Sequence, residues 1–536
     1  MALISPRQLN PVTLVALAAG VLVCVPIITI VCMGLFGQSD VWAHLVDTRL
    51  PQYLSNSFGL VVGVSLGVVL FGVPSAALVS LCDFPGRRAL SLALLLPLAF
   101  PAYILAYTYT GLLDPAGPMA RWIDPRALDS IRSLPGAAVM LSLVLYPYVY
   151  LLARASFLSR SASTLEVGRT LGLTPLRSTI KLALPMARPA IVAGLTLALM
   201  ETLADYGTVA FFGVPTFTTG IMRAYHGMGD AVAAAQLALT LLAFVALLVL
   251  LEKYSRRKLR YFSGSSRRSH SRVQLTGRNA GLAILVCALP PLLGFGVPGL
   301  TLLWWGLTDA RDQWVDLVPH ALSSFGLASA AALLLVGSAL ALGYAERTAP
   351  SRLTRGLTQI AGLGYALPGT IIAVGVLIPL AQADQWLFLF FRDHLGVNVG
   401  LPLTGTVAAV LVAYGARFTA VSLGAITSGL GRIKPSLDEA ATLLGYRPLQ
   451  IVRRVHVPLM RGAVLTSALV VFVDVLKELP ATLILRPFDF NTLAVRAYEL
   501  ASDERLLDAA PASLMIVAVG LIPVVYLNRS VSEAKY

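Results

Sequence analysis

The chain has little charge and little cysteine for its length. Charged residues make up 13% of its 536 residues, and cysteine occurs only four times. Soluble globular domains carry about 25% charged residues, so this composition excludes an ordinary soluble protein. The cysteines show no paired spacing typical of a metal site or a disulfide framework, and we expect each of them to pack in an apolar interior.

Signatures of nucleotide and nucleic-acid binding are missing as well. No Gly-x-x-x-x-Gly-Lys-Ser/Thr segment is present to hold phosphates, and no polar stretch is long enough to form an ATPase domain. The formal net charge of +14 could indicate a nucleic-acid partner, but Lys and Arg concentrate in alternate loops between apolar runs. This is the positive-inside asymmetry of membrane proteins, so we expect no nucleic acid and place both termini in the cytoplasm.

Long apolar runs are what the sequence has in excess. Hydrophobic residues make up 57% of the chain, and runs of about 20 residues, enough to cross a bilayer, recur throughout. We predict an all-α polytopic membrane protein whose first run is retained as a span rather than cleaved as a signal peptide. The twelve predicted spans are 12–36, 58–82, 89–113, 136–158, 190–213, 231–252, 279–306, 320–345, 356–381, 403–425, 462–485 and 509–528.

One pattern occurs twice. It runs from Ser163 to Pro185 and again from Ser436 to Pro458, and matched residues are always 273 positions apart. A fixed register over this distance indicates duplication. We therefore predict a first transmembrane half at residues 1–252, a basic linker at 253–278 and a second half at 279–536. Each half holds six spans in the same orientation, so the two repeats are parallel.

The linker at 253–278 is rich in serine and carries nine Lys or Arg residues. We interpret it as a flexible cytoplasmic connector that also fixes the topology. Contact with anionic lipid headgroups is the alternative.

The repeated pattern predicts a helix–turn–helix unit at the cytoplasmic surface, between the fourth and fifth spans of each half. Ser163 and Glu166 have the spacing of a capping box, as have Ser436 and Glu439. Gly172 and Gly445 then permit a sharp turn. In each copy a proline follows, Pro175 or Pro448, and suits the first position of a second helix.

This loop resembles the Glu-Ala-Ala-x-x-x-Gly segment with which permeases of ABC importers dock into an ATPase subunit. The second copy keeps the full motif in Glu439, Ala440, Ala441 and Gly445. The first copy keeps Glu166 and Gly172 but has Val167 and Gly168 at the two alanine positions, so its docking is expected to differ in detail. The resemblance implies two docking sites on one chain and ATP hydrolysis in separate subunits.

Acidic residues also repeat inside the predicted fifth spans. Glu201 and Asp205 are four residues apart, and Asp474 and Glu478 repeat this spacing 273 residues later. In a helix each pair shares a face, and ionised groups at membrane depth normally pair or line a water-filled route. We expect these four acids, with Lys477, to form a translocation pathway or gate. Neutralisation by Lys477, or a place at the external mouth, is the alternative. No His or Cys joins the acids, so we name no metal ligand.

The sequence segments around these acids resemble segments of ferric-iron ABC-importer permeases. Glu201-Thr-Leu-Ala-Asp205-Tyr-Gly-Thr-Val209 resembles their first half, and Lys477-Glu-Leu-Pro-Ala-Thr482 resembles their second. The resemblance covers nearly the whole chain. It implies a fused permease of a bacterial inner membrane that binds no cofactor itself, works with two ATPase subunits and receives ferric iron from a periplasmic binding protein.

Three alternatives remain open from sequence. Related fused permeases serve thiamine and other small solutes, and an ion-coupled secondary transporter would also suit parallel repeats. A receptor or scaffold would need a soluble domain that the sequence does not contain. The predicted external loop at 487–508 is interpreted as solvated, with docking of a binding protein as the alternative, and neither Tyr225 nor Tyr498 is assigned as an iron ligand.

Overall fold

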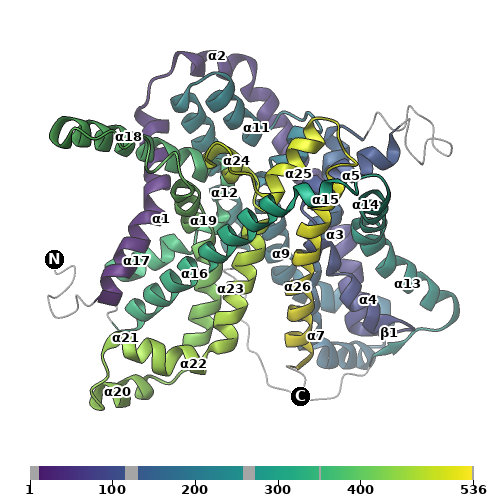
Figure 1. The fold of residues 1–536 in the computed structure, drawn as a ribbon. Helices are drawn as coiled ribbons and strands as arrows, with labels where there is room; N and C mark the ends of the chain where they lie inside the picture. The colour runs from purple at the N-terminus through teal and green to yellow at the C-terminus, as the bar shows by residue number, and fades with distance from the viewer. Residues whose placement is uncertain (1–10, 115–130, 257–271, 349–351, 534–536) are drawn as a thin grey trace. The chain divides into compact units, whose positions relative to one another are not determined.

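The computed structural model describes residues 11–114, 131–256, 272–348 and 352–533. In these ranges the fold is almost entirely helical (Figure 1), as the sequence predicts. The only strands in the described part are β1 (Cys82–Asp83) and β2 (Val273–Gln274), which pair in parallel. Residues 257–271 of the predicted linker lie outside the described ranges.

Nine of the described helical segments are long and apolar enough to cross a membrane. Two further segments pass the same test only as bent pairs: Arg87–Ala99 with Ala102–Leu113, bent by 94°, and Pro448–Leu459 with Arg461–Leu476, bent by 88°. A shorter apolar helix covers Ala510–Val525. All twelve predicted spans overlap one of these segments, although the exact number of twelve is not confirmed.

The chain folds into two compact units, and each draws on both halves of the sequence. Unit 1 consists of residues 1–47, 220–242 and 314–496, and unit 2 of residues 48–219, 243–313 and 497–536. Five helices contain a boundary between the units: α2 (Asp40–Thr48), α11 (Phe217–Met222), α12 (Ala231–Arg256), α15 (Gln313–Asp316) and α25 (Leu493–Ser502).

Unit 1 is built mainly from the second half of the sequence, with the first predicted span added. Its elements are α1 (Pro11–Phe36), η4 (Arg223–Gly227), α16 (Val318–Thr348), α17 (Arg352–Ala361), η6 (Gly364–Ala366), α18 (Gly369–Leu395), α19 (Val407–Leu430), α20 (Pro435–Leu443), α21 (Pro448–Ile451), η7 (Val452–His456), α22 (Val457–Leu459), α23 (Arg461–Leu476) and α24 (Pro480–Leu485). Helix α1 packs against α16, α17, α18 and α19. Small residues allow a close approach at one crossing, where a Cβ on Gly375 of α18 would lie 2.5 Å from the Pro26 carbonyl oxygen of α1.

Unit 2 reverses this arrangement, because the first span of the second half joins helices of the first half. Its elements are α3 (Leu50–Leu81), β1, α4 (Arg87–Ala93), η2 (Leu96–Ala99), α5 (Ala102–Leu113), α7 (Leu134–Thr170), α8 (Pro175–Ser178), η3 (Thr179–Ala183), α9 (Leu184–Ala204), α10 (Gly207–Phe211), β2, α13 (Gly277–Pro291), η5 (Leu292–Gly296), α14 (Val297–Thr308) and α26 (Ala510–Glu533). Helix α3 packs along α7, and α14 packs on α26 and α5. The boundary between the two sequence repeats therefore does not coincide with the boundaries between the two compact units.

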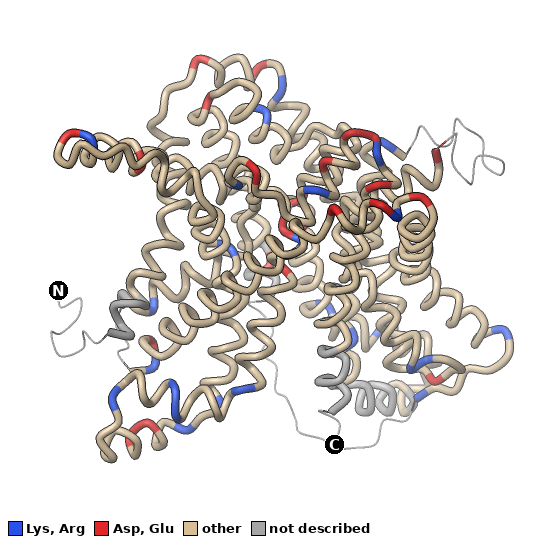
Figure 2. The backbone as a smooth tube through the Cα atoms, in the orientation of Figure 1, with Lys and Arg blue, Asp and Glu red and all other residues tan. Residues whose placement is uncertain are grey.

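Charged side chains are sparse along the long helices and gather near their ends. Figure 2 shows Lys and Arg concentrated around α20, α21 and α22 of unit 1. Four of these basic residues, Arg432, Lys434, Arg447 and Arg454, are exposed. All four cysteines are free. The folded chain thus keeps the repeated loop of its second half at a basic, polar end of unit 1.

Candidate functional site

The second repeated loop is two short helices joined by a tight turn. Helix α20 ends at Leu443, and Gly445 has φ +80°. The Tyr446 amide donates to the Ala441 carbonyl at 3.0 Å, which is the long hydrogen bond of a glycine-terminated helix end. Pro448 then begins α21, and the chain continues through the π-helical segment η7. The predicted turn at Gly445 and the helix start at Pro448 are confirmed.

The first repeated loop has the same backbone design in the same register. Gly172 has φ +68°, and the Leu173 amide donates to the Gly168 carbonyl at 2.9 Å. Helix α8 begins at Pro175, and the π-helical segment η3 follows it. Each of these features lies 273 residues before its counterpart, including both ends of the π-helical segment. The duplication therefore extends to an irregular backbone feature that sequence patterns did not reveal.

The predicted capping boxes are wrong in both copies. Helix α7 runs without a break from Leu134 to Thr170, so Ser163 lies inside a helix rather than at the start of one. In the second copy the residue preceding the first turn of α20 is Lys434, and Ser436 is already within that turn. The structure instead places a cap at the residue two positions after each turn glycine: the Gln450 Oε1 accepts from the Arg447 amide at 2.9 Å, and the Thr174 Oγ1 accepts from the Arg177 amide at 3.4 Å.

The residues of the Glu-Ala-Ala-x-x-x-Gly motif divide into exposed and buried positions. Glu439, Ala440 and Gly445 are exposed, whereas Ala441 is buried in a cluster that includes Tyr344 and Ile426. For Glu166 and Val167 the structure describes the backbone, within α7, but not the side chains. A surface formed by Glu439 and Ala440 is therefore available to a partner, while Ala441 ties α20 to its own unit.

Gly168 replaces the buried alanine in the first copy for a steric reason. A Cβ at this position would lie 2.2 Å from Ser178 Oγ and 2.8 Å from Ser178 Cβ. Ser178 is itself buried in α8, so it has little room to move. The departure from alanine is thus compensated by the residue that packs against it, and the loop keeps its shape.

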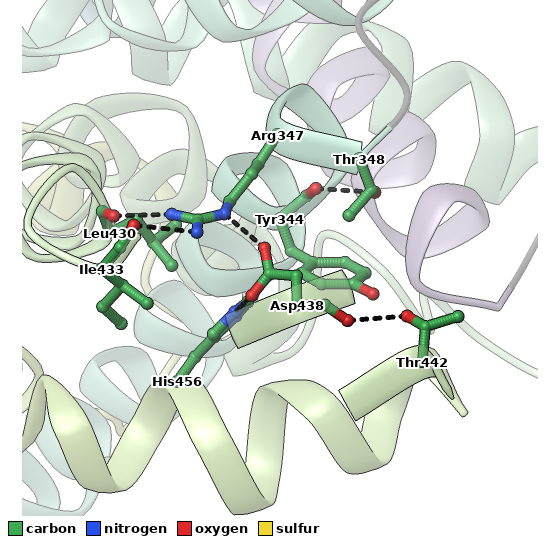
Figure 3. Close-up of polar contacts among 8 residues, drawn as sticks. All are labelled: Tyr344, Arg347, Thr348, Leu430, Ile433, Asp438, Thr442 and His456. Carbon is green, nitrogen blue, oxygen red and sulfur yellow. Dashed lines mark hydrogen bonds and ion pairs between the residues drawn. The ribbon is translucent and has the colours of Figure 1, made fainter. Parts of the chain in front are cut away.

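A charged network fixes the second loop to the helices behind it (Figure 3). Arg347, near the end of α16, donates from Nε to Asp438 Oδ2 at 2.6 Å. Its two other nitrogens donate to the Leu430 and Ile433 carbonyls at 2.7 and 2.9 Å, at the end of α19 and just beyond it. His456 Nε2 lies 2.6 Å from Asp438 Oδ1, and because an ionised carboxylate only accepts, the imidazole is the donor.

This network joins α16, α19, α20 and η7 through one carboxylate. Arg347 and Asp438 are each 16% exposed, and the His456 side chain is fully buried. The positions 273 residues before Asp438 and His456 are Leu165 and Ala183, which cannot form such contacts. The two loops share a backbone design, but only the second has the Asp438–His456 contact.

Exposed leucines surround the turn in both loops. Leu171 and Leu176 of the first loop are 64% and 70% exposed, and their counterparts Leu444 and Leu449 are 77% and 66% exposed. Leu443, 89% exposed, adds to the second group. Apolar side chains gathered in this way at a polar surface are typical of an interaction site. The sequence signal for them was present as repeated leucines, but their exposure was not predictable from periodicity.

The acids of the predicted fifth spans do not share helix faces as expected, because both spans break. Helix α9 ends at Ala204 and the C-cap Asp205 is extended, with ψ 130°. Helix α23 ends at Leu476, and Pro480 then starts α24. Pro480 has no amide hydrogen to donate to the Leu476 carbonyl, which favours an interruption of the helix before it. Asp205 and Glu478 therefore lie in equivalent breaks between a long helix and a short one.

Each of these two carboxylates binds the beginning of the short helix that follows it. Asp205 accepts from Thr208 Oγ1 at 2.9 Å and from the Val209 amide at 3.1 Å. Glu478 accepts from the Ala481 and Thr482 amides, both at 3.0 Å. These contacts satisfy amide groups that a helix start leaves without partners.

The two breaks differ in how their charge is balanced. Arg417 of α19 donates to Glu478 Oε1 at 3.0 Å, and both side chains are buried. Asp474 pairs with Lys477 at 3.2 Å, as the neutralisation alternative expected. Glu201 is partly exposed near the end of α9. The pairing of Glu478 with Arg417, 61 residues away, was not foreseen from sequence. No group of three or more His, Cys, Asp or Glu residues suitable for a metal occurs in the described ranges.

Comparison with known proteins identifies the fold. Residues 9–261 match the family described as binding-protein-dependent transport system inner membrane component. The chain is 25% identical over 524 residues to the Fe(3+)-transport system permease protein FbpB 2 of Haemophilus influenzae, covering 96% of this chain and 97% of that protein. It is 24% identical to the probable ABC transporter permease protein y4fN of Sinorhizobium fredii, over 91% of this chain and 88% of the other.

Shorter matches concern permeases named for anions. The sulfate transport system permease protein CysT of Escherichia coli is 28% identical over 142 residues, which is 26% of this chain and 51% of CysT. The family match, the near full-length similarity to two permeases and the paired docking-type loops agree with one another. Residues 9–261 match the inner membrane components of binding-protein-dependent transport systems, and the chain is similar along nearly its whole length to ABC transporter permeases.

Proposed function

We propose that this chain is the membrane-spanning subunit of an ATP-driven importer for ferric iron. The choice of ferric iron as the substrate rests on the similarity to a ferric-iron permease along 96% of this chain. The similarity to the sulfate permease covers 26%. Binding of substrate outside, hydrolysis of ATP inside and alternating access through this chain divide the work between subunits, so the chain itself catalyses no reaction.

Two ATPase subunits would bind at the two repeated loops, one at each. In this arrangement Glu439 and Ala440 meet the partner together with the exposed leucines Leu444 and Leu449. The first loop would present Gly172, Leu171 and Leu176, with Glu166 as the position equivalent to Glu439. Because both loops share their turn and their π-helical segment, two copies of one ATPase can fit both. A periplasmic binding protein would deliver the ion to the opposite face.

The experiment is reconstitution of the chain with its ATPase and binding protein in lipid vesicles. We expect uptake of radiolabelled ferric iron that requires ATP and the binding protein. Uptake of thiamine, sulfate or another solute in place of iron would overturn the choice of substrate. Uptake by the chain alone, driven by an ion gradient without ATP, would instead indicate a secondary transporter.

A second experiment tests the docking surface directly. Single cysteines at Leu444 and Leu171 should each form a crosslink to the ATPase with a short bifunctional reagent. Phe488, which is fully exposed in the predicted external loop, provides the matched control position. Equal crosslinking of all three positions, or of Phe488 alone, would contradict the assignment.

A further inference from the structure

Three tyrosines of unit 2 that are far apart in the sequence lie together. The rings of Tyr103 and Tyr498 are 6.4 Å apart at an angle of 84°, and those of Tyr206 and Tyr498 are 5.9 Å apart. Tyr103 lies in the first turn of α5, Tyr206 follows Asp205 in the break after α9, and Tyr498 lies on α25. The three phenols therefore come from three separate elements.

Simple aromatic packing does not account for the hydroxyl groups. Tyr103 is 5% exposed, and Tyr107, one turn later on α5, is 1% exposed with no hydrogen-bond partner for its hydroxyl among the described residues. Phenylalanine would fill nearly the same space, and burying a hydroxyl without a full set of partners costs free energy. The Tyr107 hydroxyl is therefore an unpartnered polar group one turn from Tyr103 in the described part of the chain.

The charge around the cluster favours a cation. Asp205, next to Tyr206 in the chain, forms no ion pair with any Lys or Arg in the described part of the chain; its carboxylate accepts from Thr208 and Val209. The nearby loop acid Glu504 is already paired, since Arg132 donates to both of its oxygens at 2.9 Å and so lowers the pKa of that carboxyl. Asp205 is thus an acid next to Tyr206 that has no basic partner among the described residues.

The equivalent positions of unit 1 show what is special to unit 2. The repeat relates Tyr103 to Thr370, Tyr206 to Leu479 and Tyr498 to Tyr225. It also relates Asp205 to Glu478, which Arg417 neutralises, and the position equivalent to Arg417 is Val144. Unit 1 has one tyrosine and a balanced carboxylate, whereas unit 2 has three tyrosines and an unbalanced one.

Resting on the proposed function, we propose that Tyr103, Tyr206 and Tyr498 form a transient site for ferric iron in unit 2. Ferric iron is a hard cation that prefers anionic oxygen ligands, and tyrosinate is an established ligand of iron in proteins. Asp205 supplies negative potential beside the site while continuing to hold the start of α10. Unit 1 then serves the transport cycle without a matching site.

Binding at this site is ligand exchange without oxidation or reduction. A phenol oxygen forms a bond to the ferric ion, its O–H bond breaks, and the proton passes to water, so each bound tyrosine releases one proton. The ligand displaced from iron, a water molecule or a chelator oxygen, leaves with its own electron pair. Binding is consequently favoured as the pH rises, because metal and proton compete for the same oxygen.

The test uses the full chain in lipid nanodiscs, titrated with ferric nitrilotriacetate. Tyrosinate bound to ferric iron gives a visible charge-transfer absorption that the free chelate lacks. We expect this band in the unsubstituted chain, at least a fivefold loss of its amplitude in Tyr498→Phe and in Tyr206→Phe, and no change in Tyr225→Phe. These substitutions keep the rings, and an unchanged thermal midpoint checks that the fold is retained.

Two results would overturn the inference: no band in the unsubstituted chain at saturating ferric chelate, or a band of equal amplitude in Tyr498→Phe. If the reconstituted complex transports ferric iron but gives neither the band nor an effect of Tyr498→Phe, the site is wrong and the proposed function stands. If the complex transports a different solute and no iron, the proposed function fails, whatever the spectrum shows.

Discussion

Asp438 Oδ1 and His456 Nε2 lie 2.6 Å apart, so a residue inside the docking-type motif is bonded to the π-helical segment that leads into the next span. The other oxygen of Asp438 binds Arg347 at the end of α16. One carboxylate thereby couples α20 to α16 and η7 of unit 1. These elements are joined through side-chain hydrogen bonds as well as through the loop backbone.

Replacing Asp438 with asparagine should loosen α20. Removing one partner of a buried ion pair costs about 3–5 kcal/mol, and because Arg347 keeps two carbonyl acceptors and the pair is slightly exposed, we expect about 1–2 kcal/mol here. Hydrogen–deuterium exchange of residues 435–443 should become faster. Residues 163–171 of the same sample serve as the internal control, and equal acceleration in both segments would refute a specific role for Asp438.

Replacing Gly445 with valine should disrupt the turn of the second loop. Its φ of +80° costs a residue with a side chain about 1–2 kcal/mol, and a β-branched residue suffers more. We expect the variant to insert into the membrane but to lose most of its ATPase on co-purification. Gly172→Val should be harmful in the same way, with a smaller effect.

Asparagine provides the matched control at both turns, because it adopts the left-handed region more readily than valine. Gly445→Asn and Gly172→Asn should retain most of the bound ATPase. Normal transport and assembly by Gly445→Val would remove the docking role from this turn.

Gly168→Ala should destabilise the first loop, although the second copy has alanine at the same position. The new Cβ would lie 2.2 Å from Ser178 Oγ, and overpacking of this kind costs about 1–3 kcal/mol. The double variant Gly168→Ala with Ser178→Gly removes the obstacle and should recover part of the lost thermal stability. A single variant as stable as the unsubstituted chain would show that the loop relaxes around the methyl group.

Sequence reasoning succeeded where the signal was local. Gly172, Gly445, Pro175 and Pro448 each impose a backbone conformation through their own chemistry, and the structure has the predicted turns and helix starts at all four. It failed at Ser163, because a favourable cap residue does not start a helix when the preceding span simply continues through it.

The contacts that the sequence did not predict join residues that are far apart in the chain. Arg347 and Asp438 are 91 residues apart, and nothing in the local pattern of either predicts the other. The same holds for Tyr103 and Tyr498, which come together only because unit 2 takes its C-terminal segment from the second half of the chain. A repeat reveals which residues are equivalent, but it does not reveal which elements exchange between the units.

The Arg417–Glu478 pair distinguishes a structural role from a pathway role for the membrane acids. Arg417→Met leaves Glu478 buried without its cation and should cost about 3–5 kcal/mol, whereas Arg417→Met with Glu478→Gln removes both charges and should cost less than the sum of the single changes. If Glu478 acts only by holding α24, the double variant should recover ATP-dependent uptake along with its thermal stability. Recovery of stability without any recovery of uptake would show that the Glu478 carboxylate itself is needed in the pathway.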